Sequence, residues 1–366
     1  MSLTERERQR LAPEIFRLPI DRIRDGYYSD AYFNHTKLLL ETEGRHPRAL
    51  MQVFQREEAI LGGVDEAIAV LKQGAGRRGP DGRWVPGFKD LEVRALHEGD
   101  AIAPWETVMT IEGDYSLFSH LETVYLGCMA RRTLVMRNVR RVVEAAHGKP
   151  ILFFPARHDH WLVQTGDGWA AHIAGAIGVS TDAQASWWGG RGVGTVPHAL
   201  IAAYGGDTAL AARKFADRFS RDMNVTVLVD FQNDSVKTAL EVADALGEDL
   251  WGVRLDTSNT LADESLRRLH GDAAPKGVAA ELVELTRSEL DKHGYPNVRI
   301  VASGGFTAER IHTFEEAGVP VDSYGVGSSL IRGSNDFTAD VVMNNGQPAA
   351  KVGREHRPNP RLDLVR

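Results

Sequence analysis

The sequence predicts an α/β protein whose larger part is an irregular or incomplete (β/α) barrel, preceded by a smaller N-terminal α/β domain. Short apolar runs alternate with amphipathic segments in the second half, the runs being 151–154, 225–229, 251–255, 298–302 and 321–325 and the amphipathic segments including 236–246 and 278–292. This alternation is typical of βαβ units and a parallel sheet. The first strand is not followed by Gly-x-Gly-x-x-Gly and the strands are irregularly spaced, which favours a barrel over a dinucleotide-binding sheet.

The chain of 366 residues is long for one compact domain, and three segments are expected. Residues 1–112 form the N-terminal α/β domain, with strands predicted near 49–55, 91–95 and 107–112. Residues 113–336 contain a linking helix, indicated by helical periodicity from Asp114 to Ala146, followed by the barrel. Residues 337–366 form a C-terminal tail that we expect to pack on the N-terminal domain.

Composition excludes several classes of protein. The formal net charge of −7 argues against a general nucleic-acid-binding protein. Cys128 is the single cysteine, which excludes an internal disulfide framework and a cysteine-based zinc site. The first residues lack the apolar stretch of a secretory signal, and no apolar run is long enough to span a membrane. We therefore expect a cytoplasmic protein with no membrane or nucleic-acid partner.

Most of the predicted barrel strands lead into polar or glycine residues. These residues are Asp230, Arg254 and Asp256, the run Ser303-Gly304-Gly305, and Gly325 with Gly327. Because the functional groups of α/β barrels gather at the C-terminal ends of the strands, we expect these residues to line one site.

The two glycine segments fit a phosphate cradle. Glycines let backbone N–H groups approach an anion closely, and a helix that begins behind each loop adds its dipole. Phosphate sites frequently follow the last strands of barrels. A single glycine pair is often only a turn, but two such loops on consecutive strands indicate a site for a phosphate group.

Arg254 and Asp256 alternate along one predicted strand, so their side chains point to the same face. Two interpretations are open. The pair is either an arginine clamp for phosphate beside a carboxylate for a ribose hydroxyl or Mg²⁺, or a structural ion pair, because neither charge can be buried alone. Asp230 adds a second carboxylate, and Mg²⁺ prefers one or two carboxylates with substrate oxygens. Asp230 and Asp256 are therefore the candidate metal ligands.

Histidines supply two further candidate groups. His198, after the glycine-rich run that begins at Gly192, is either a nucleophile or phosphate partner, or a core histidine satisfied by one hydrogen bond. Arg157, His158 and His160 follow the first barrel strand and could bind a carboxylate or a phosphate. The two histidines of that segment also suit a metal, although the sequence places no third ligand beside them.

In their order along the chain, these segments resemble the motifs of the nicotinate phosphoribosyltransferases, and the short archaeal-like and bacterial form in particular. The motifs are Ser29-Asp-Ala-Tyr-Phe33, Gly194-Thr-Val-Pro-His-Ala-Leu200, Gly252-Val-Arg-Leu-Asp-Thr257, Ala302-Ser-Gly-Gly-Phe306, Tyr324-Gly-Val-Gly327 and Ala350-Lys-Val-Gly-Arg354. They extend over nearly the whole chain, and their order is more specific than any one of them.

The resemblance implies transfer of phosphoribosyl from 5-phosphoribosyl diphosphate to nicotinate, giving nicotinate mononucleotide and diphosphate in NAD salvage, with coupled ATP hydrolysis. It implies Mg²⁺ as cofactor, ATP as co-substrate and a homodimer with shared active sites. The family's transiently phosphorylated histidine falls on His198, and its phosphate-clamping Arg–Asp pair falls on Arg254 and Asp256. Its 5′-phosphate loops fall on Ser303, Gly304, Gly305, Gly325 and Gly327.

The same resemblance implies where the pyridine ring is held. Tyr32 matches the aromatic residue given by the partner subunit, and Phe154 or its neighbour matches the aromatic residue of the barrel. Arg157 lies where the family holds the pyridine carboxylate or a phosphate, and His158 replaces an arginine that many relatives carry. Thr181 and Asp182 are expected near the base, where a carboxylate would suit the N–H groups of a carboxamide better than nicotinate.

Two alternatives are open on the sequence. One is an enzyme of the same fold that accepts nicotinamide, or quinolinate without ATP; quinolinate enzymes are usually shorter and lack a histidine in the context of His198. The other is a catalytically silent regulatory or binding protein. Arg254, Asp256 and both glycine loops argue against a silent protein, because charged inward residues reduce stability when they serve no function.

Overall fold

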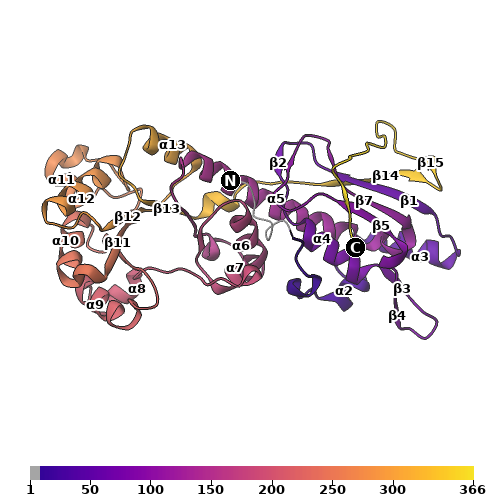
Figure 1. Cartoon of the computed structure of the whole chain (residues 1–366), viewed down its shortest axis with the longest axis horizontal. Coiled ribbons are helices and arrows are strands. Elements are labelled where there is room, and N and C mark those ends of the chain that lie inside the picture. Colours follow the sequence, from indigo (N-terminus) through magenta and orange to yellow (C-terminus); the bar gives the residue numbers. More distant parts are fainter. Residues whose placement is uncertain (1–8) are drawn as a thin grey trace. The chain divides into compact units, whose positions relative to one another are not determined.

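The computed structural model describes residues 9–366, which form two compact units (Figure 1). The first unit contains the chain up to Arg137 together with Gly333–Arg366, and the second contains Asn138–Arg332. The division falls inside helix α5 (Glu122–Ala145), whereas residue 112, the boundary expected from the sequence, lies within strand β7 (Thr107–Asp114).

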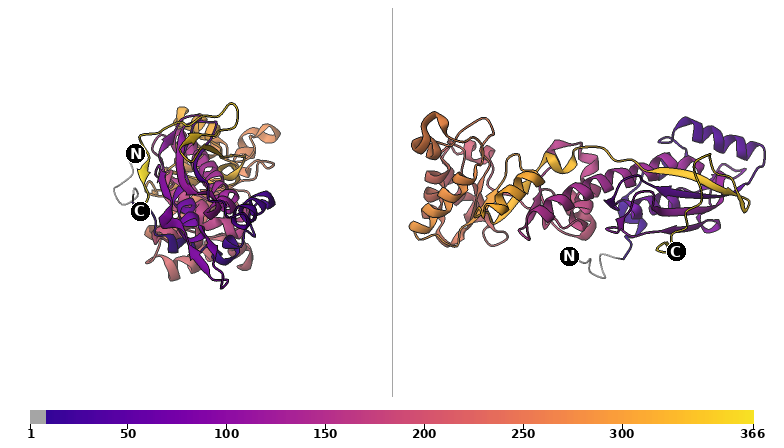
Figure 2. Two further views of the ribbon diagram at one scale, coloured as in Figure 1. Left: turned by 90° about the vertical axis from the view of Figure 1, so that its right-hand side faces the viewer. Right: turned by 90° about the horizontal axis from the view of Figure 1, so that it is seen from above.

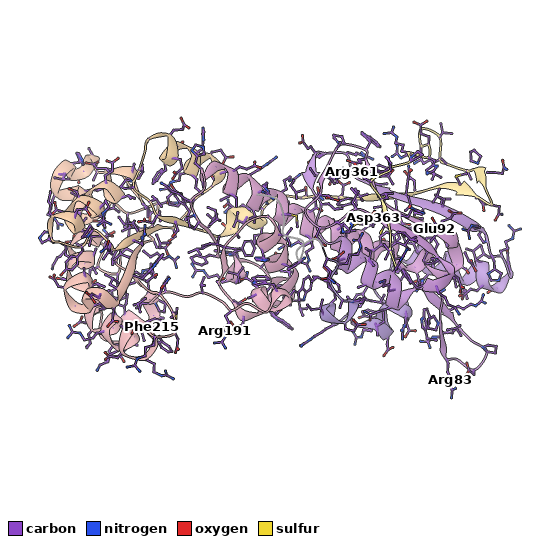
Figure 3. The ribbon with its side chains drawn as sticks, viewed as in Figure 1. Arg83, Glu92, Arg191, Phe215, Arg361 and Asp363 are labelled. Atoms are coloured by element: carbon purple, nitrogen blue, oxygen red, sulfur yellow. The ribbon has the colours of Figure 1, made fainter. Side chains whose placement is uncertain are left out.

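An antiparallel sheet is the framework of the first unit. Its order is β15-β14-β1-β7-β5-β16. The strands other than β7 are β1 (Arg48–Phe54), β5 (Glu92–Ala95), β14 (Thr338–Asn344), β15 (Gln347–Pro348) and β16 (Asp363–Leu364). The three strands predicted in the N-terminal part are confirmed. Near the C-terminus, β14 pairs with β1 and β16 pairs with β5, and Figure 3 labels Asp363 of β16 and Glu92 of β5.

Helices and two short antiparallel ladders of two strands each complete the first unit (Figure 2). The helices are α2 (Ile20–Arg24), α3 (Ala31–Thr42), α4 (Val64–Gly74) and the first part of α5, and the ladders pair β2 (Ala59–Ile60) with β6 (Ala101–Ile102) and β3 (Gly76–Arg78) with β4 (Trp84–Pro86). Leu71 of α4 and Tyr125 of α5 are fully buried in one cluster with Val53 and Met109 of the sheet. Burial of such apolar side chains is the main stabilising contribution to this unit.

The long helix begins later than its periodicity predicts. The periodic segment starts at Asp114, but α5 begins at Glu122 because two 3-10 turns precede it. The Asp114 carboxylate accepts hydrogen bonds from the backbone N–H and the hydroxyl of Ser116, at 3.0 and 2.7 Å, which fixes the first of these turns. Apolar residues of both turns are buried, so the hydrophobic pattern continues although the backbone is not α-helical.

The second unit is built on a parallel sheet in the order β10-β11-β12-β13-β8-β9. Its strands are β8 (Ile151–Phe153), β9 (Gly178–Val179), β10 (Val225–Leu228), β11 (Leu250–Leu255), β12 (Arg299–Ala302) and β13 (Ser323–Val326). Its helices are α6 (Gln164–Ile173), α7 (Asp182–Ala185), α8 (His198–Ala203), α9 (Thr208–Phe219), α10 (Ser235–Leu246), α11 (Glu264–His270), α12 (Ala280–Lys292) and α13 (Ala308–Glu316). The predicted strands and the amphipathic helices are confirmed (Figure 1).

The barrel is incomplete, as the sequence predicts, and the chain between β9 and α8 spans its open side. Strands β9 and β10 are the two edges of the sheet. The N–H of Val193 donates to the carbonyl of Val179 at 2.7 Å, and Val196 forms a parallel bridge with Val227. This segment therefore joins both edges and delivers His198 to the mouth of the barrel. In the part of the chain that the structure describes, no helix is both long and apolar enough to cross a membrane.

Candidate active site

Parallel pairing brings the polar strand ends of the second unit to one edge of the sheet. Leu228, Arg254 and Val301 lie in register on three neighbouring strands, and β13 and β8 continue the same sheet. The residues that follow each strand therefore face the same mouth, where α/β barrels carry their chemistry.

Arg254, Ser303 and Asp256 form the polar centre of this mouth. The Nε–H of Arg254 donates to Ser303 Oγ at 2.8 Å, and the Ser303 hydroxyl lies 2.7 Å from Asp256 Oδ1. The Arg254 Nη2 to Asp256 Oδ2 distance is 3.5 Å, and Nη1 lies 3.4 Å from the Thr195 hydroxyl. Ser303 is buried, so it fixes the two charged side chains that the sequence paired. A guanidinium carries five N–H groups, so further donors are available to a ligand.

An aromatic face lies beside the arginine. The Arg254 guanidinium carbon is 5.1 Å from the centre of the Phe154 ring, a cation–π distance. The Phe154 N–H donates to the carbonyl of Val326 at 2.8 Å, which fixes this backbone. A side chain on Gly325 would place its Cβ 2.8 Å from the Phe154 ring. Only glycine leaves room for the ring there. Gly325 therefore makes space for the Phe154 side chain and is not needed for a turn.

His198 and Asp230 form a second pair at the mouth. His198 Nε2 lies 3.0 Å from Asp230 Oδ1, and the Asp230 carboxylate is largely buried while the imidazole is 42% exposed. Burial raises the pKa of Asp230, the His198 bond opposes this shift, and the negative charge of Asp256 adds to it. The histidine is not a core residue, because its ring is accessible and its partner is an acid.

The first glycine loop is held by a residue that the sequence did not single out. Gly304 and Gly305 have φ of 86° and 73°, the left-handed region that favours glycine. Arg310 donates from Nη1 to the Gly304 carbonyl at 3.0 Å and from Nη2 to the Val278 carbonyl at 2.7 Å. Its guanidinium also lies over Phe306, 4.3 Å from the ring centre. Burial lowers the pKa of Arg310.

The second glycine loop approaches the segment after β8. A Cβ on Gly327 would lie 2.9 Å from the imidazole of His158, so glycine permits this close contact. Arg157 and His158 lie on an exposed 3-10 turn (Ala156–His158). Partial burial lowers the pKa of His158, and the neighbouring charges of Arg157 and Arg332 add to that shift. The turn therefore carries the permanent charge of Arg157 in an exposed position.

Thr181 and Asp182 have partners within the protein. Thr181 caps helix α7, and its hydroxyl lies 3.0 Å from Gln164 Oε1. Asp182 Oδ1 accepts the N–H of Gly192 at 2.8 Å and so ties helix α7 to the segment that leads to His198. Figure 3 shows Arg191, next to this bond, extending away from the segment.

Tyr32 belongs to the other unit. It lies on α3 with 61% of its surface exposed, and its ring centre is 4.4 Å from that of Phe33. The hydroxyl of Thr123 donates to the Asp30 carboxylate at 2.8 Å just before this helix, which connects the start of α3 to α5.

Sequence reasoning missed two residues of the mouth. Thr195 lies inside the motif that ends at His198, and its contact with Arg254 arises only when the segment crosses the open side of the barrel. No local sequence pattern marks Arg310, because its side chain reaches back from helix α13 to the loop before that helix. A basic residue soon after a glycine loop is the one hint that the sequence offers.

Residues 30–133 match the family described as quinolinate phosphoribosyl transferase, N-terminal domain. Nicotinate phosphoribosyltransferase pncB1 of Mycobacterium tuberculosis is 32% identical over 269 residues, which are 71% of this chain and 55% of the relative. The chain spans about half the length of the curated relatives it matches.

Solved structures extend the match over nearly the whole chain. A nicotinate-nucleotide pyrophosphorylase from Pyrococcus furiosus is 31% identical with a TM-score of 0.78, covering 95% of this chain and 85% of that one. The chain belongs to the nicotinate phosphoribosyltransferase family. The human nicotinic acid phosphoribosyltransferase structure shares the fold, at 18% identity and a TM-score of 0.64 over 88% of this chain and 76% of its own. Membership of the nicotinate phosphoribosyltransferase family confirms the resemblance carried by the ordered motifs.

Proposed function

We propose that this protein is a nicotinate phosphoribosyltransferase, which transfers phosphoribosyl from 5-phosphoribosyl diphosphate to nicotinate and releases diphosphate. The observation that carries the proposal is the contact of Arg254 with Phe154. Hydrogen bonds through Ser303 to Asp256 hold the Arg254 side chain in this position. An aromatic face suits the pyridine ring, and the adjacent guanidinium suits phosphate oxygens. The two substrates would thus meet at one point of the barrel mouth.

The glycine loops supply the anchor for the 5′-phosphate. Backbone N–H groups around Gly304 and Gly305 can approach a phosphate without hindrance from side chains, and helix α13 begins just after this loop. Ser303, Gly325 and Gly327 complete the proposed phosphate side of the site. Anchoring of the substrate at a remote phosphate contributes to catalysis because it orients the reacting carbon.

The residues at the mouth fit a magnesium diphosphate. Asp230 and Asp256 are two carboxylates at the mouth, where the negative charge of Asp256 raises the pKa of Asp230, and each retains oxygen lone pairs beyond the hydrogen bond described above. Carboxylates with substrate oxygens are the ligand set that Mg²⁺ prefers. When bound, Mg²⁺ would neutralise charge on the leaving diphosphate. Arg254 would stabilise the same group directly, since charge develops there as the bond to ribose breaks.

His198 is the proposed acceptor for the γ-phosphate of ATP. With Asp230 ionised, the His198 Nε2–H donates to the carboxylate, and the lone pair then lies on Nδ1. Nδ1 would attack the γ-phosphorus, with ADP leaving, and Asp230 would stabilise the positive ring. The phosphorylated ring would place negative charge next to the diphosphate site, which is how we propose that ATP hydrolysis is coupled.

Nicotinate is the acceptor that the charges favour. Arg157 supplies a permanent positive charge on an exposed turn, which suits the carboxylate of nicotinate. Asp182, whose carboxylate would have suited the carboxamide of nicotinamide, has a role within the protein, because it accepts the Gly192 N–H and ties helix α7 to the segment before His198. Quinolinate carries a second carboxylate and would need a further cation, whereas partial burial and the charges of Arg157 and Arg332 lower the pKa of the adjacent His158 and so disfavour a positive charge there.

We further propose a cytoplasmic homodimer with shared active sites. Tyr32 supports this, because an exposed tyrosine on α3 is available to stack on a base bound by a second subunit. The single cysteine suits a reducing compartment.

A comparison of three acceptor bases tests the proposal. Initial rates are measured with 5-phosphoribosyl diphosphate and Mg²⁺ and with nicotinate, nicotinamide or quinolinate, each with and without ATP. We expect the highest kcat/KM with nicotinate and stimulation by ATP. Preference for quinolinate without ATP would replace the proposal with the quinolinate enzyme, and no turnover of any base would support a silent homologue. ATP stimulation that persists in His198→Ala would remove the phosphohistidine step.

A further inference from the structure

Three potential metal ligands meet on the surface of the second unit, away from the barrel mouth. They are His147, which follows the C-terminal end of α5, and His312 and Glu316 of α13. One ligand atom from each residue lies within 4.8 Å of the others, and all three side chains are exposed. The rings of His147 and His312 have centres 5.8 Å apart at an interplanar angle of 82°. Among residues 9–366 this is the one such group of three.

The spacing of these residues explains their convergence. His312 and Glu316 are four residues apart on one helix, which brings their side chains to the same face. His147 comes from a turn whose backbone is closed by bonds from His147 N–H to the Glu144 carbonyl and from Lys149 N–H to the Ala146 carbonyl. His147 itself has φ of 47°, a conformation that few residues other than glycine adopt but that histidine tolerates.

The turn and the helix are already joined at the base of this group. Lys149 Nζ lies 2.9 Å from the Glu315 carboxylate and donates to the Val319 carbonyl at 3.2 Å. Both contacts connect the turn that carries His147 to the end of α13. The ligands therefore sit on a backbone that is fixed without a metal, so binding requires only rotation of exposed side chains.

We propose that His147, His312 and Glu316 form a binding site for a divalent transition metal of the zinc type. Two imidazoles and one carboxylate are a common set for Zn²⁺, with bonds of about 2.0–2.2 Å, and a water can supply the fourth ligand. Imidazole suits zinc, cobalt and nickel, whereas magnesium prefers oxygen ligands alone. A bound ion would link the end of α5 to α13, the helix that begins at the Gly304–Gly305 loop.

Calorimetric titration of the chelator-treated full chain with zinc chloride tests this site. We expect one zinc-binding event that His147→Ala and His312→Ala each weaken by at least about tenfold, since each removes one of three protein ligands. Glu316→Gln keeps the size of the side chain and should also weaken it. Cobalt chloride should give visible absorption bands of a nitrogen- and oxygen-bound ion that disappear in the same variants.

His270→Ala is the matched control. His270 is also exposed and lies 2.6 Å from a single carboxylate, Glu281, but within residues 9–366 no third potential ligand completes a group with this pair. Zinc binding in this variant should equal that of the unmodified chain. Equal zinc affinity in all variants, or no binding event that depends on His147 and His312, would overturn the proposal. The readout is binding, so neither outcome depends on the phosphoribosyltransferase reaction.

Discussion

Replacement of Gly325 by alanine tests whether the Phe154 ring is part of the substrate site. The added Cβ would lie 2.8 and 2.9 Å from two ring carbons of Phe154 and 3.2 Å from Ser303 Cβ. Gly325 has no positive φ, so alanine introduces no backbone strain. The main effect of the substitution is therefore displacement of the ring, with a smaller pressure on Ser303.

The contact distances give the size of this displacement. Non-bonded carbon atoms are normally about 3.5–4.0 Å apart, so the ring must move by roughly 0.6–1.2 Å. The Phe154 backbone is held by Val326, so the movement must come from rotation of the side chain, which also disturbs the contact with Arg254. Misplacement of about 1 Å reduces rates by up to ~100-fold, or about 2.7 kcal/mol. We expect kcat/KM for nicotinate to fall by ~10- to 100-fold, and the overpacking to reduce stability by about 1–3 kcal/mol.

Initial rates over a range of nicotinate concentrations, with a thermal melt of the same sample, separate the two effects. Gly127→Ala is the matched control, because among the residues that the structure describes no atom outside its own stretch of α5 lies within 4 Å of the added Cβ. Alanine there should stabilise the helix by up to about 1 kcal/mol and leave the rate unchanged. A folded Gly325→Ala protein with unchanged kcat/KM for nicotinate would refute the role of Phe154.

Three further predictions concern the glycine loop, a buried acid and the segment before the histidine. Arg310→Met should raise KM for 5-phosphoribosyl diphosphate and lower stability by about 1–3 kcal/mol, because the partly buried carbonyls of Gly304 and Val278 lose their donor. Saturation kinetics measure KM and a urea melt measures stability; an unchanged KM contradicts the prediction. Burial and a neighbouring acid raise the pKa of Glu98 to about 8, so the folded state holds this proton more tightly than the unfolded state. Its contribution is full below about pH 4.5 and is lost as the pH rises through 8; urea melts should show this decline in the unmodified chain and a smaller one in Glu98→Gln. Asp182→Asn keeps an oxygen for the Gly192 N–H and should retain activity, whereas Asp182→Ala should reduce it, and equal initial rates in the two variants would exclude this positioning role.

The strands of both units could be predicted because their apolar runs are short and bounded by polar or glycine residues. The run at 225–229 became β10, and Asp230 lies at its end as expected. The start of α5 could not be found in this way, since the buried residues of 3-10 turns continue a helical hydrophobic pattern. Only the Asp114 side chain, which caps the first turn, marks the difference.

The residue types of the site could be predicted from the sequence, but the hydrogen bonds that join these residues could not. Arg254 and Asp256 were paired because they alternate along one strand, but Ser303, which joins them, was expected only as part of a glycine loop. Such contacts depend on the register between neighbouring strands, which no local pattern encodes. The same applies to His147, whose partners on α13 lie far away in the sequence.

The most direct test of the proposed activity is the identity and amount of product. The chain is incubated with nicotinate, 5-phosphoribosyl diphosphate and Mg²⁺, and nicotinate mononucleotide and diphosphate are quantified by chromatography. We predict equal amounts of both products, formed at a rate that falls by at least about 100-fold in Asp256→Asn, because that change disturbs Arg254 and the proposed metal site together. Absence of nicotinate mononucleotide, or its formation at the same rate in Asp256→Asn, would contradict the proposed function.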